Sequence, residues 1–138
     1  MSDLMRVSFS IERSLYTQLE ALLQTTAYGN RSEFIRDLVR ERLVRDAWRS
    51  DEEAIGAITM VYDHARRELS GKLVHLQHHH HDAILVTTHV HLSRDLCVEA
   101  ILVRGSAALI ETLADELRAQ KGVLHVAVSM SSTGKRLK

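Results

Sequence analysis

The stretch HHHHDAILVTTHVHLSRDLC, residues 78–97, decides how the second half of this chain folds. It contains the apolar run ILVTTHVH and, after the turn-like LSRD, leads into a second apolar run, CVEAILV. Two such runs around a short polar turn predict a β-hairpin. The stretch also holds six of the nine histidines and the only cysteine. The residues that order the fold are therefore also those that can bind a metal.

Three side chains of this stretch form a candidate metal site. His89 and His91 are two residues apart on the expected strand, so both imidazoles point to the same face. Cys97 begins the next strand, where a hairpin can bring its thiolate near the imidazoles. Imidazole and thiolate suit late transition metals such as nickel, copper, cobalt and zinc. From the pattern alone, the alternative is two exposed histidines and a buried thiol that acts as a small hydrophobe.

The chain around the hairpin predicts a β-α-β-β-α-β order over residues 54–130. This order is typical of the ferredoxin-like split motif, here of the ACT type, in which helices cover one face of an antiparallel sheet. The polar residues 131–138 are expected to form a disordered tail. From the spacing of apolar residues, strands are expected at 54–62, 83–91, 97–103 and 123–129, and helices at 63–77 and 105–119.

The first 49 residues predict one strand followed by two helices, joined to the second domain by a linker at 50–53. Residues 5–11, MRVSFSI, alternate in polarity, and helices are expected at 11–26 and 31–49. A single short strand has no partner here, so it is expected to pair with the same strand of a second chain. This is the ribbon–helix–helix arrangement of strand-reading DNA-binding proteins. The alternative is a helical dimerisation domain whose polar strand face is merely solvated.

Motifs along nearly the whole chain resemble the nickel-responsive transcriptional repressors of the NikR family. They are RVSFSI, NRSEFIRD, QHHHHD, THVH and the cysteine at position 97, within residues 5–130. The resemblance implies one Ni(II) per chain in a planar site at a subunit interface. His89, His91 and Cys97 would come from one chain and His78 from its neighbour. It also implies a homotetramer, a dimer of dimers, that binds a palindromic operator and represses nickel-uptake genes when nickel is bound.

The resemblance places DNA contacts on one strand face and one helix N-terminus. Arginine can bind guanine in the major groove, and hydroxyl groups can bond to any base. The free N–H groups at a helix N-terminus can hold a phosphate. The candidate residues are Arg6, Ser8 and Ser10 on the strand and Asn30, Arg31 and Ser32 at the helix.

Two further pairs of residues have both a plain and a functional interpretation. Glu33 and Asp37 lie one helical turn apart. They form a solvated surface or, by the resemblance, a weaker cation site used in the DNA-bound form. Tyr62 and Glu99 either pack in the core and near an interface, or hydrogen-bond to the metal ligands.

The overall composition narrows the possible functions. Net charge is zero, so charge alone does not indicate a nucleic-acid partner. No apolar run approaches the roughly 20 residues of a membrane span, and residues 1–10 lack a signal-peptide core, which favours a cytoplasmic location without membrane contact. No glutamate lies in a metal-hydrolase motif, and a fourth ligand is at hand, so no enzyme is expected. The competing hypothesis is a ribbon–helix–helix repressor that senses copper, cobalt, zinc or a small organic ligand.

Overall fold

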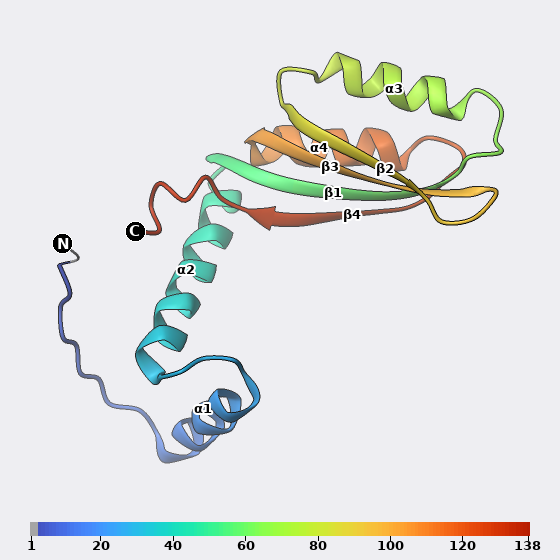
Figure 1. The fold of residues 1–138 in the computed structure, drawn as a ribbon. Helices are drawn as coiled ribbons and strands as arrows, with labels where there is room; N and C mark the ends of the chain where they lie inside the picture. The colour runs from blue at the N-terminus through green and yellow to red at the C-terminus, as the bar shows by residue number, and fades with distance from the viewer. Residues whose placement is uncertain (1–2) are drawn as a thin grey trace. The chain divides into compact units, whose positions relative to one another are not determined.

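The computed structural model describes residues 3–138 and shows an α+β chain (Figure 1). Residues 1 and 2 of the expected 1–49 domain lie outside the described residues. The β-α-β-β-α-β order predicted for the second domain is confirmed. The elements are α1 (Arg13–Thr25), α2 (Arg31–Arg49), β1 (Glu53–Asp63), α3 (Leu69–His79), β2 (Ile84–His91), β3 (Leu96–Ser106), α4 (Ala107–Arg118) and β4 (Val123–Ser131).

The sheet has the strand order β2-β3-β1-β4, and every neighbouring pair is antiparallel. Both α3 and α4 lie on the same face of this sheet (Figure 1). The register places Cys97 of β3 opposite Tyr62 of β1 on one side and opposite His91 of β2 on the other. Cys97, near the start of β3, therefore lies between Tyr62 and His91 in the sheet.

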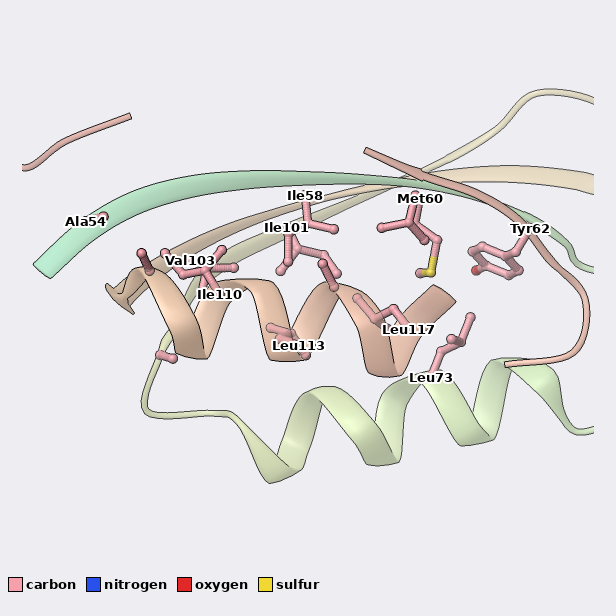
Figure 2. Packing of buried hydrophobic residues seen from close by; sticks show 14 of the residues in the cluster. Ala54, Ile58, Met60, Tyr62, Leu73, Ile101, Val103, Ile110, Leu113 and Leu117 are labelled. Atoms are coloured by element: carbon pink, nitrogen blue, oxygen red, sulfur yellow. The ribbon is translucent and has the colours of Figure 1, made fainter. Parts of the chain in front are cut away.

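The hydrophobic core lies between the sheet and the two helices (Figure 2). Every second residue of β1 is buried, as expected for a strand with one covered face. Helix α4 begins where the Ser106 hydroxyl accepts a hydrogen bond from the Leu109 amide at 3.2 Å, an N-terminal cap that fixes its first turn. The labelled core residues are Ala54, Ile58, Met60 and Tyr62 of β1, Ile101 and Val103 of β3, Leu73 of α3, and Ile110, Leu113 and Leu117 of α4.

Helix α3 begins at Leu69, six residues later than the predicted start at residue 63. Asp63 still belongs to β1, and its carboxylate accepts a hydrogen bond from the Ala65 amide at 2.9 Å, which closes a turn. Glu68 has a left-handed backbone with φ of 68°. A right-handed helix cannot pass through that conformation, so the predicted helical spacing before Leu69 does not form a helix.

The end of α2 packs within the second of two compact units, Met1–Val39 and Arg40–Lys138. Trp48 is buried in the core of this second unit, and its indole Nε1 donates a hydrogen bond to the Ser131 carbonyl at 2.8 Å. The units thus divide within α2, before the expected linker at 50–53. The tail expected to be disordered starts with Ser131, the last residue of β4, and its Arg136 donates to both carboxylate oxygens of Glu52 at 2.8 and 2.9 Å.

In the first unit, residues 3–12 form neither helix nor strand. Val7 and Phe9 are 77% and 61% exposed, so the half-buried strand expected at 5–11 is not formed within one chain. A strand exists only when its backbone is hydrogen-bonded to a neighbouring strand. Among residues 3–39, Phe34 is the one buried hydrophobic residue. The unit therefore leaves most of its apolar side chains without cover.

Replacing Gly56 by alanine is expected to lower the free energy of unfolding by about 1–3 kcal/mol. A Cβ at this position would lie 2.8 Å from Cγ2 of Ile110 and 3.3 Å from Cη2 of Trp48. Both side chains are buried, so neither can move aside without disturbing the packed core. Gly71→Ala is the matched control, because nothing lies within 4 Å of its Cβ and alanine favours a helix by up to about 1 kcal/mol. Denaturant unfolding measures both, and equal stability of the two variants would contradict the close packing at Gly56.

Candidate metal centre

The structure brings the side chains of His89, His91 and Cys97 together. Their ligand atoms all lie within 4.8 Å of one another. Nδ1 of His91 is 3.2 Å from Sγ of Cys97, and the two imidazole centroids are 5.0 Å apart. Among residues 3–138, no other group of three or more histidine, cysteine, aspartate or glutamate residues has its donor atoms so close together. The two imidazoles are exposed and the thiol is buried, so the group faces solvent on its histidine side.

The hairpin between β2 and β3 holds the three ligands in place. The amides of Leu92 and Ser93 both donate hydrogen bonds to the Leu96 carbonyl, at 2.8 and 3.2 Å. The Leu96 amide donates to the Ser93 hydroxyl at 3.2 Å. These bonds close the turn directly beside the ligands, and the register then pairs His91 with Cys97. The LSRD turn predicted from the sequence is therefore what sets the distance from imidazole to thiol.

Tyr62 of β1 lies against the candidate site. Its hydroxyl lies 3.3 Å from Nδ1 of His89, and the side chain is only 2% exposed. Burial, with smaller effects of Glu99 and Cys97, raises the pKa of Tyr62 to about 12, so the group stays a neutral phenol near pH 7. The phenol oxygen can accept the Nδ1–H of His89, which leaves Nε2 as the lone-pair donor for a metal.

A second set of hydrogen bonds joins the end of α3 to the sheet. Gln77 donates from Nε2 to a carboxylate oxygen of Glu99 at 2.8 Å, and the Thr87 hydroxyl donates to Gln77 Oε1 at 3.2 Å. Glu99 is buried and stands opposite His89 in the β2–β3 register. The structure thus places Glu99, a candidate from the sequence, on the same strand as Cys97 and links it by a hydrogen bond to Gln77, the residue before His78.

His78 does not join the three ligands of its own chain. It lies on the last turn of α3 and is exposed, and its ring stacks on that of His81 with centroids 5.7 Å apart. The group of close donor atoms contains His89, His91 and Cys97 without it. One chain therefore brings three of the four expected ligands together on the β2–β3 hairpin, and it carries the fourth, His78, at the end of α3.

His64 is the residue near the site that sequence reasoning missed. Its ring centroid is 5.1 Å from that of His91, and its amide donates a hydrogen bond to the Asp95 carbonyl at 2.6 Å. The sequence motifs do not include this histidine among the candidate ligands. A signal was present in the chain, because His64 directly follows β1, whose last residue pairs with Leu96 at the start of β3.

The donor chemistry of the group fits a late transition metal. It offers two imidazoles and one thiol, with no carboxylate among the close donor atoms. Thiolate and imidazole favour nickel, copper and zinc over magnesium or calcium, which take oxygen ligands. The three ligands would hold such an ion and leave room for a fourth donor.

The candidate DNA contacts all lie exposed in the first unit. Arg6, Ser8 and Ser10 are in the extended segment 3–12. Asn30 caps α2, because its side-chain oxygen accepts a hydrogen bond from the Glu33 amide at 3.0 Å. The remaining two candidates, Arg31 and Ser32, form the exposed first turn of that helix.

Several of the charged candidates in this unit already have partners. Arg31 donates to Glu20 at 2.5 Å and to the Tyr16 hydroxyl at 2.8 Å, and its hydrogen bond holds the pKa of Glu20 below the usual range. Glu33 pairs with Arg36 at 3.4 Å. The carboxylate of Asp37 accepts a hydrogen bond from the Tyr28 hydroxyl at 2.7 Å. A cation or phosphate at these positions would have to compete with these contacts.

Among residues 3–138, every helix is too short or too polar to cross a bilayer.

Two family models match the chain, one in each part. Residues 5–46 match the ribbon–helix–helix proteins of the CopG family, and residues 55–131 match the C-terminal nickel-binding domain of NikR.

Curated relatives are similar to the chain over nearly its whole length. A protein of Syntrophus aciditrophicus named as a nickel-responsive regulator is 42% identical over 97% of this chain and 98% of its own length. One of Geobacter sulfurreducens with the same name is 44% identical over 99% of both. The fold is also similar to that of an uncharacterized protein from Thermotoga maritima, with a TM-score of 0.53, 18% identity, and 57% of this chain and 98% of that one covered.

Proposed function

The chain belongs to the NikR family of nickel-responsive ribbon–helix–helix regulators, and from this premise we propose that it represses nickel-uptake genes when Ni(II) is bound. As a member of that family it is a DNA-binding regulator and not an enzyme. The observation that carries the proposal is the convergence of two imidazoles and a thiol inside the domain that matches the nickel-binding model. Repression is the sign of regulation that the whole-chain resemblance favours.

His89, His91 and Cys97 are the proposed nickel ligands of one chain, and His78 of a neighbouring copy is the fourth. The support is that the first three donors meet in one chain while His78 does not reach them. With one ion per chain, each nickel would then link the three ligands of one chain to the His78 of a neighbouring chain. Tyr62 orients the imidazole of His89, and the contacts of Gln77 hold the turn of α3 that carries His78.

A homotetramer, a dimer of dimers, is the proposed assembly. Two surfaces support it. The segment 3–12 exposes Val7 and Phe9 and has the alternation of a strand that lacks a partner. The sheet face away from α3 and α4 exposes Val86 and Val90 of β2, about half of each side chain. If segment 3–12 pairs with the same segment of a second chain, the two form a ribbon. If the exposed sheet face packs against another copy, the metal-binding domains form the centre of the tetramer.

Operator recognition is proposed to lie on the paired segment 3–12. Arg6, Ser8 and Ser10 would contact base edges, and the N-terminus of α2, with Asn30, Arg31 and Ser32, would hold a phosphate. Two such ribbons in one tetramer would bind the two halves of a palindromic operator at once, which raises the affinity beyond that of either alone. The chain would act in the cytoplasm, where such an operator lies.

Replacing Arg6 by alanine is expected to weaken specific operator binding by about 1–3 kcal/mol, because one bidentate contact to guanine is lost. A gel-shift or anisotropy titration at fixed salt and saturating nickel measures the change. Arg67→Ala, which removes an exposed arginine of the second unit, is the matched control and should leave binding unchanged. Equal effects of the two variants would mean that only the loss of positive charge matters and that Arg6 reads no base.

One combined experiment tests the proposed function against its alternatives. Ni(II) is titrated into the metal-free protein while thiolate-to-metal absorption is followed, and operator binding is measured in parallel. Operator affinity should rise as the absorption band saturates. Copper, cobalt and zinc are tested in the same way, because the ligand set accepts all of them. If another metal raises the operator affinity and nickel leaves it unchanged, the assignment to nickel is contradicted.

A further inference from the structure

Residues 132–137, here called the C-terminal strap, follow β4 and run back along the second half of α2. At one end the Ser131 carbonyl accepts a hydrogen bond from the indole of Trp48 at 2.8 Å. At the other end the Leu137 carbonyl accepts one from Nε of Arg40 at 3.3 Å. Residues 40 and 48 lie about 12 Å apart along a helix, so the strap spans roughly two turns of α2.

An apolar groove lies between the strap and α2. Its lining includes Leu43, Val44 and Ala47 of the helix, with Thr133 and Leu137 of the strap. Positions 43, 44 and 47 recur at helical spacing, so they share one side of α2. Leu137 is half-buried there, although it lies well beyond the last strand. Burial of apolar surface therefore contributes to holding the strap against the helix.

The strap also has a turn and a polar contact of its own. The Leu137 amide donates to the Gly134 carbonyl at 3.2 Å, and the Gly134 amide donates to the Ser132 hydroxyl at 3.0 Å. Gly134 has a φ of 78°, a left-handed conformation that favours glycine. Arg136 then donates to both carboxylate oxygens of Glu52 at 2.8 and 2.9 Å. The turn thus directs one side chain to α2 and the next to the start of the sheet.

These contacts hold the strap only weakly. The side chains of Arg136 and Glu52 are 69% and 40% exposed, and ion pairs so open to solvent stabilise little. Leu137 gains only part of what full burial of a leucine would contribute. Elements with few buried contacts open locally while the core stays folded. The strap can therefore be released without unfolding the sheet and its helices.

The helix that the strap covers connects the two units of the chain. The division between the units falls within α2, after Val39, so residues 40–49 belong to the second unit. The helix ends before Asp51, which has a φ of 55° and whose carboxylate accepts a hydrogen bond from the Ala108 amide at 2.7 Å. With the strap docked, residues 40–49 are held both at this end and along their length.

We propose that the C-terminal strap fixes residues 40–49 of α2 to the metal-binding unit, and that nickel strengthens operator binding in full only while the strap is docked. The second statement rests on the proposed function. Nickel changes operator affinity only as far as a free-energy difference reaches the DNA-binding unit. With the strap released, the second half of α2 moves independently of the sheet, and less of that difference is transmitted.

Amide hydrogen exchange of the full-length, metal-free protein tests the strap without nickel or DNA. In the double replacement Arg136→Ala and Leu137→Ala, the amides of residues 40–49 should exchange about fivefold faster or more, because the helix loses its cover. Lys138→Ala removes one positive charge from the same tail and is the control, with exchange rates unchanged. Natural exchange rates in β1 and α4 of every variant show that the core stays folded.

Operator titrations with and without Ni(II) then measure the gain in affinity that nickel produces. Substitutions in a coupling element change such a gain by roughly three- to thirtyfold, and the double variant should lose that much of it. Its thiolate-to-nickel band should saturate at the same nickel concentration as in the natural protein. A smaller gain with intact nickel binding and an intact core is not expected from a general loss of stability. Lys138→Ala should keep the full gain.

Natural exchange rates at residues 40–49 of the double variant would overturn the strap, and a full nickel gain in that variant would overturn its role in operator binding. If the natural protein itself shows no gain with Ni(II), the proposed function fails instead. The exchange measurement still decides whether the strap holds α2, so the two failures are distinguishable.

Discussion

Replacing Cys97 by alanine is expected to abolish nickel-dependent operator binding. The thiol is the only sulfur donor among the three converging ligands, and its Sγ lies 3.2 Å from Nδ1 of His91. Groups that merely orient metal ligands contribute about 10–100-fold to metal affinity, so loss of a ligand should cost more than roughly 100-fold. The thiolate-to-nickel absorption band should disappear, and operator affinity should no longer respond to Ni(II).

Alanine is the right replacement, because Cys97 is fully buried. A serine would place an additional hydroxyl group in the core at this position, with its own cost of desolvation. The variant should keep its helix content by circular dichroism and its mass in sedimentation without metal, which shows that the fold and the assembly persist. Nickel-dependent operator binding at the natural level in this folded variant would refute the proposed site.

Mixing two inactive variants is expected to restore nickel binding. His78→Ala and Cys97→Ala should each lose the complete four-ligand site. If His78 comes from a neighbouring chain, co-expression of both variants lets a His78→Ala chain supply His89, His91 and Cys97 to a site completed by the His78 of a Cys97→Ala chain. With random assembly in equal amounts, about a quarter of the sites should be complete. Recovery of the absorption band measures this fraction.

The control for this experiment is a mixture of His89→Ala with Cys97→Ala. Those two losses affect the same three-ligand group of one chain, so no pairing of chains can rebuild it. Recovery in the first mixture but not in the second identifies a shared site. No recovery in either mixture would place all ligands in one chain, and normal nickel binding by His78→Ala alone would remove that residue from the site.

The meeting of His89, His91 and Cys97 could be predicted because it follows from local rules. Alternate residues of a strand share a face, and a short turn returns the chain beside them. The runs flanking the LSRD turn contain β-branched residues in sufficient number to identify both strands. The order of elements in the second unit follows equally from apolar spacing, and the structure confirms it.

The contacts that complete the site depend on register, which spacing does not reveal. The approach of Tyr62 to His89 requires the pairing of β1 with β3 and of β3 with β2. The pairing of β1 with β4 shifts between Val61 and Tyr62, and that of β2 with β3 shifts between Ile84 and Val86. Such irregularities leave no clear sign in composition. The link from Gln77 to Glu99 joins residues 22 apart and is equally invisible to local patterns.

Helix α3 shows how a backbone conformation can override periodicity. Residues 63–77 carry apolar residues at helical spacing, yet the left-handed Glu68 delays the helix to Leu69. The strand expected at 5–11, which is predicted to pair with a second chain, is absent from the single chain for a different reason. Its hydrogen-bonding partner would belong to another molecule, and one chain alone cannot supply it.

The burial of Cys97 also bears on how the protein withstands oxygen. Oxidation of a cysteine to sulfenic acid and beyond requires that peroxide reach the sulfur, and it depends on the thiolate character of that sulfur. Here the sulfur is 0% exposed, while the two imidazoles of the site are open to solvent. Small hydrated cations can reach the histidines first, whereas oxidants and alkylating reagents find the cysteine thiol buried. Burial of this kind slows such reactions, and so protects the single cysteine of the chain in the form that can bind a metal.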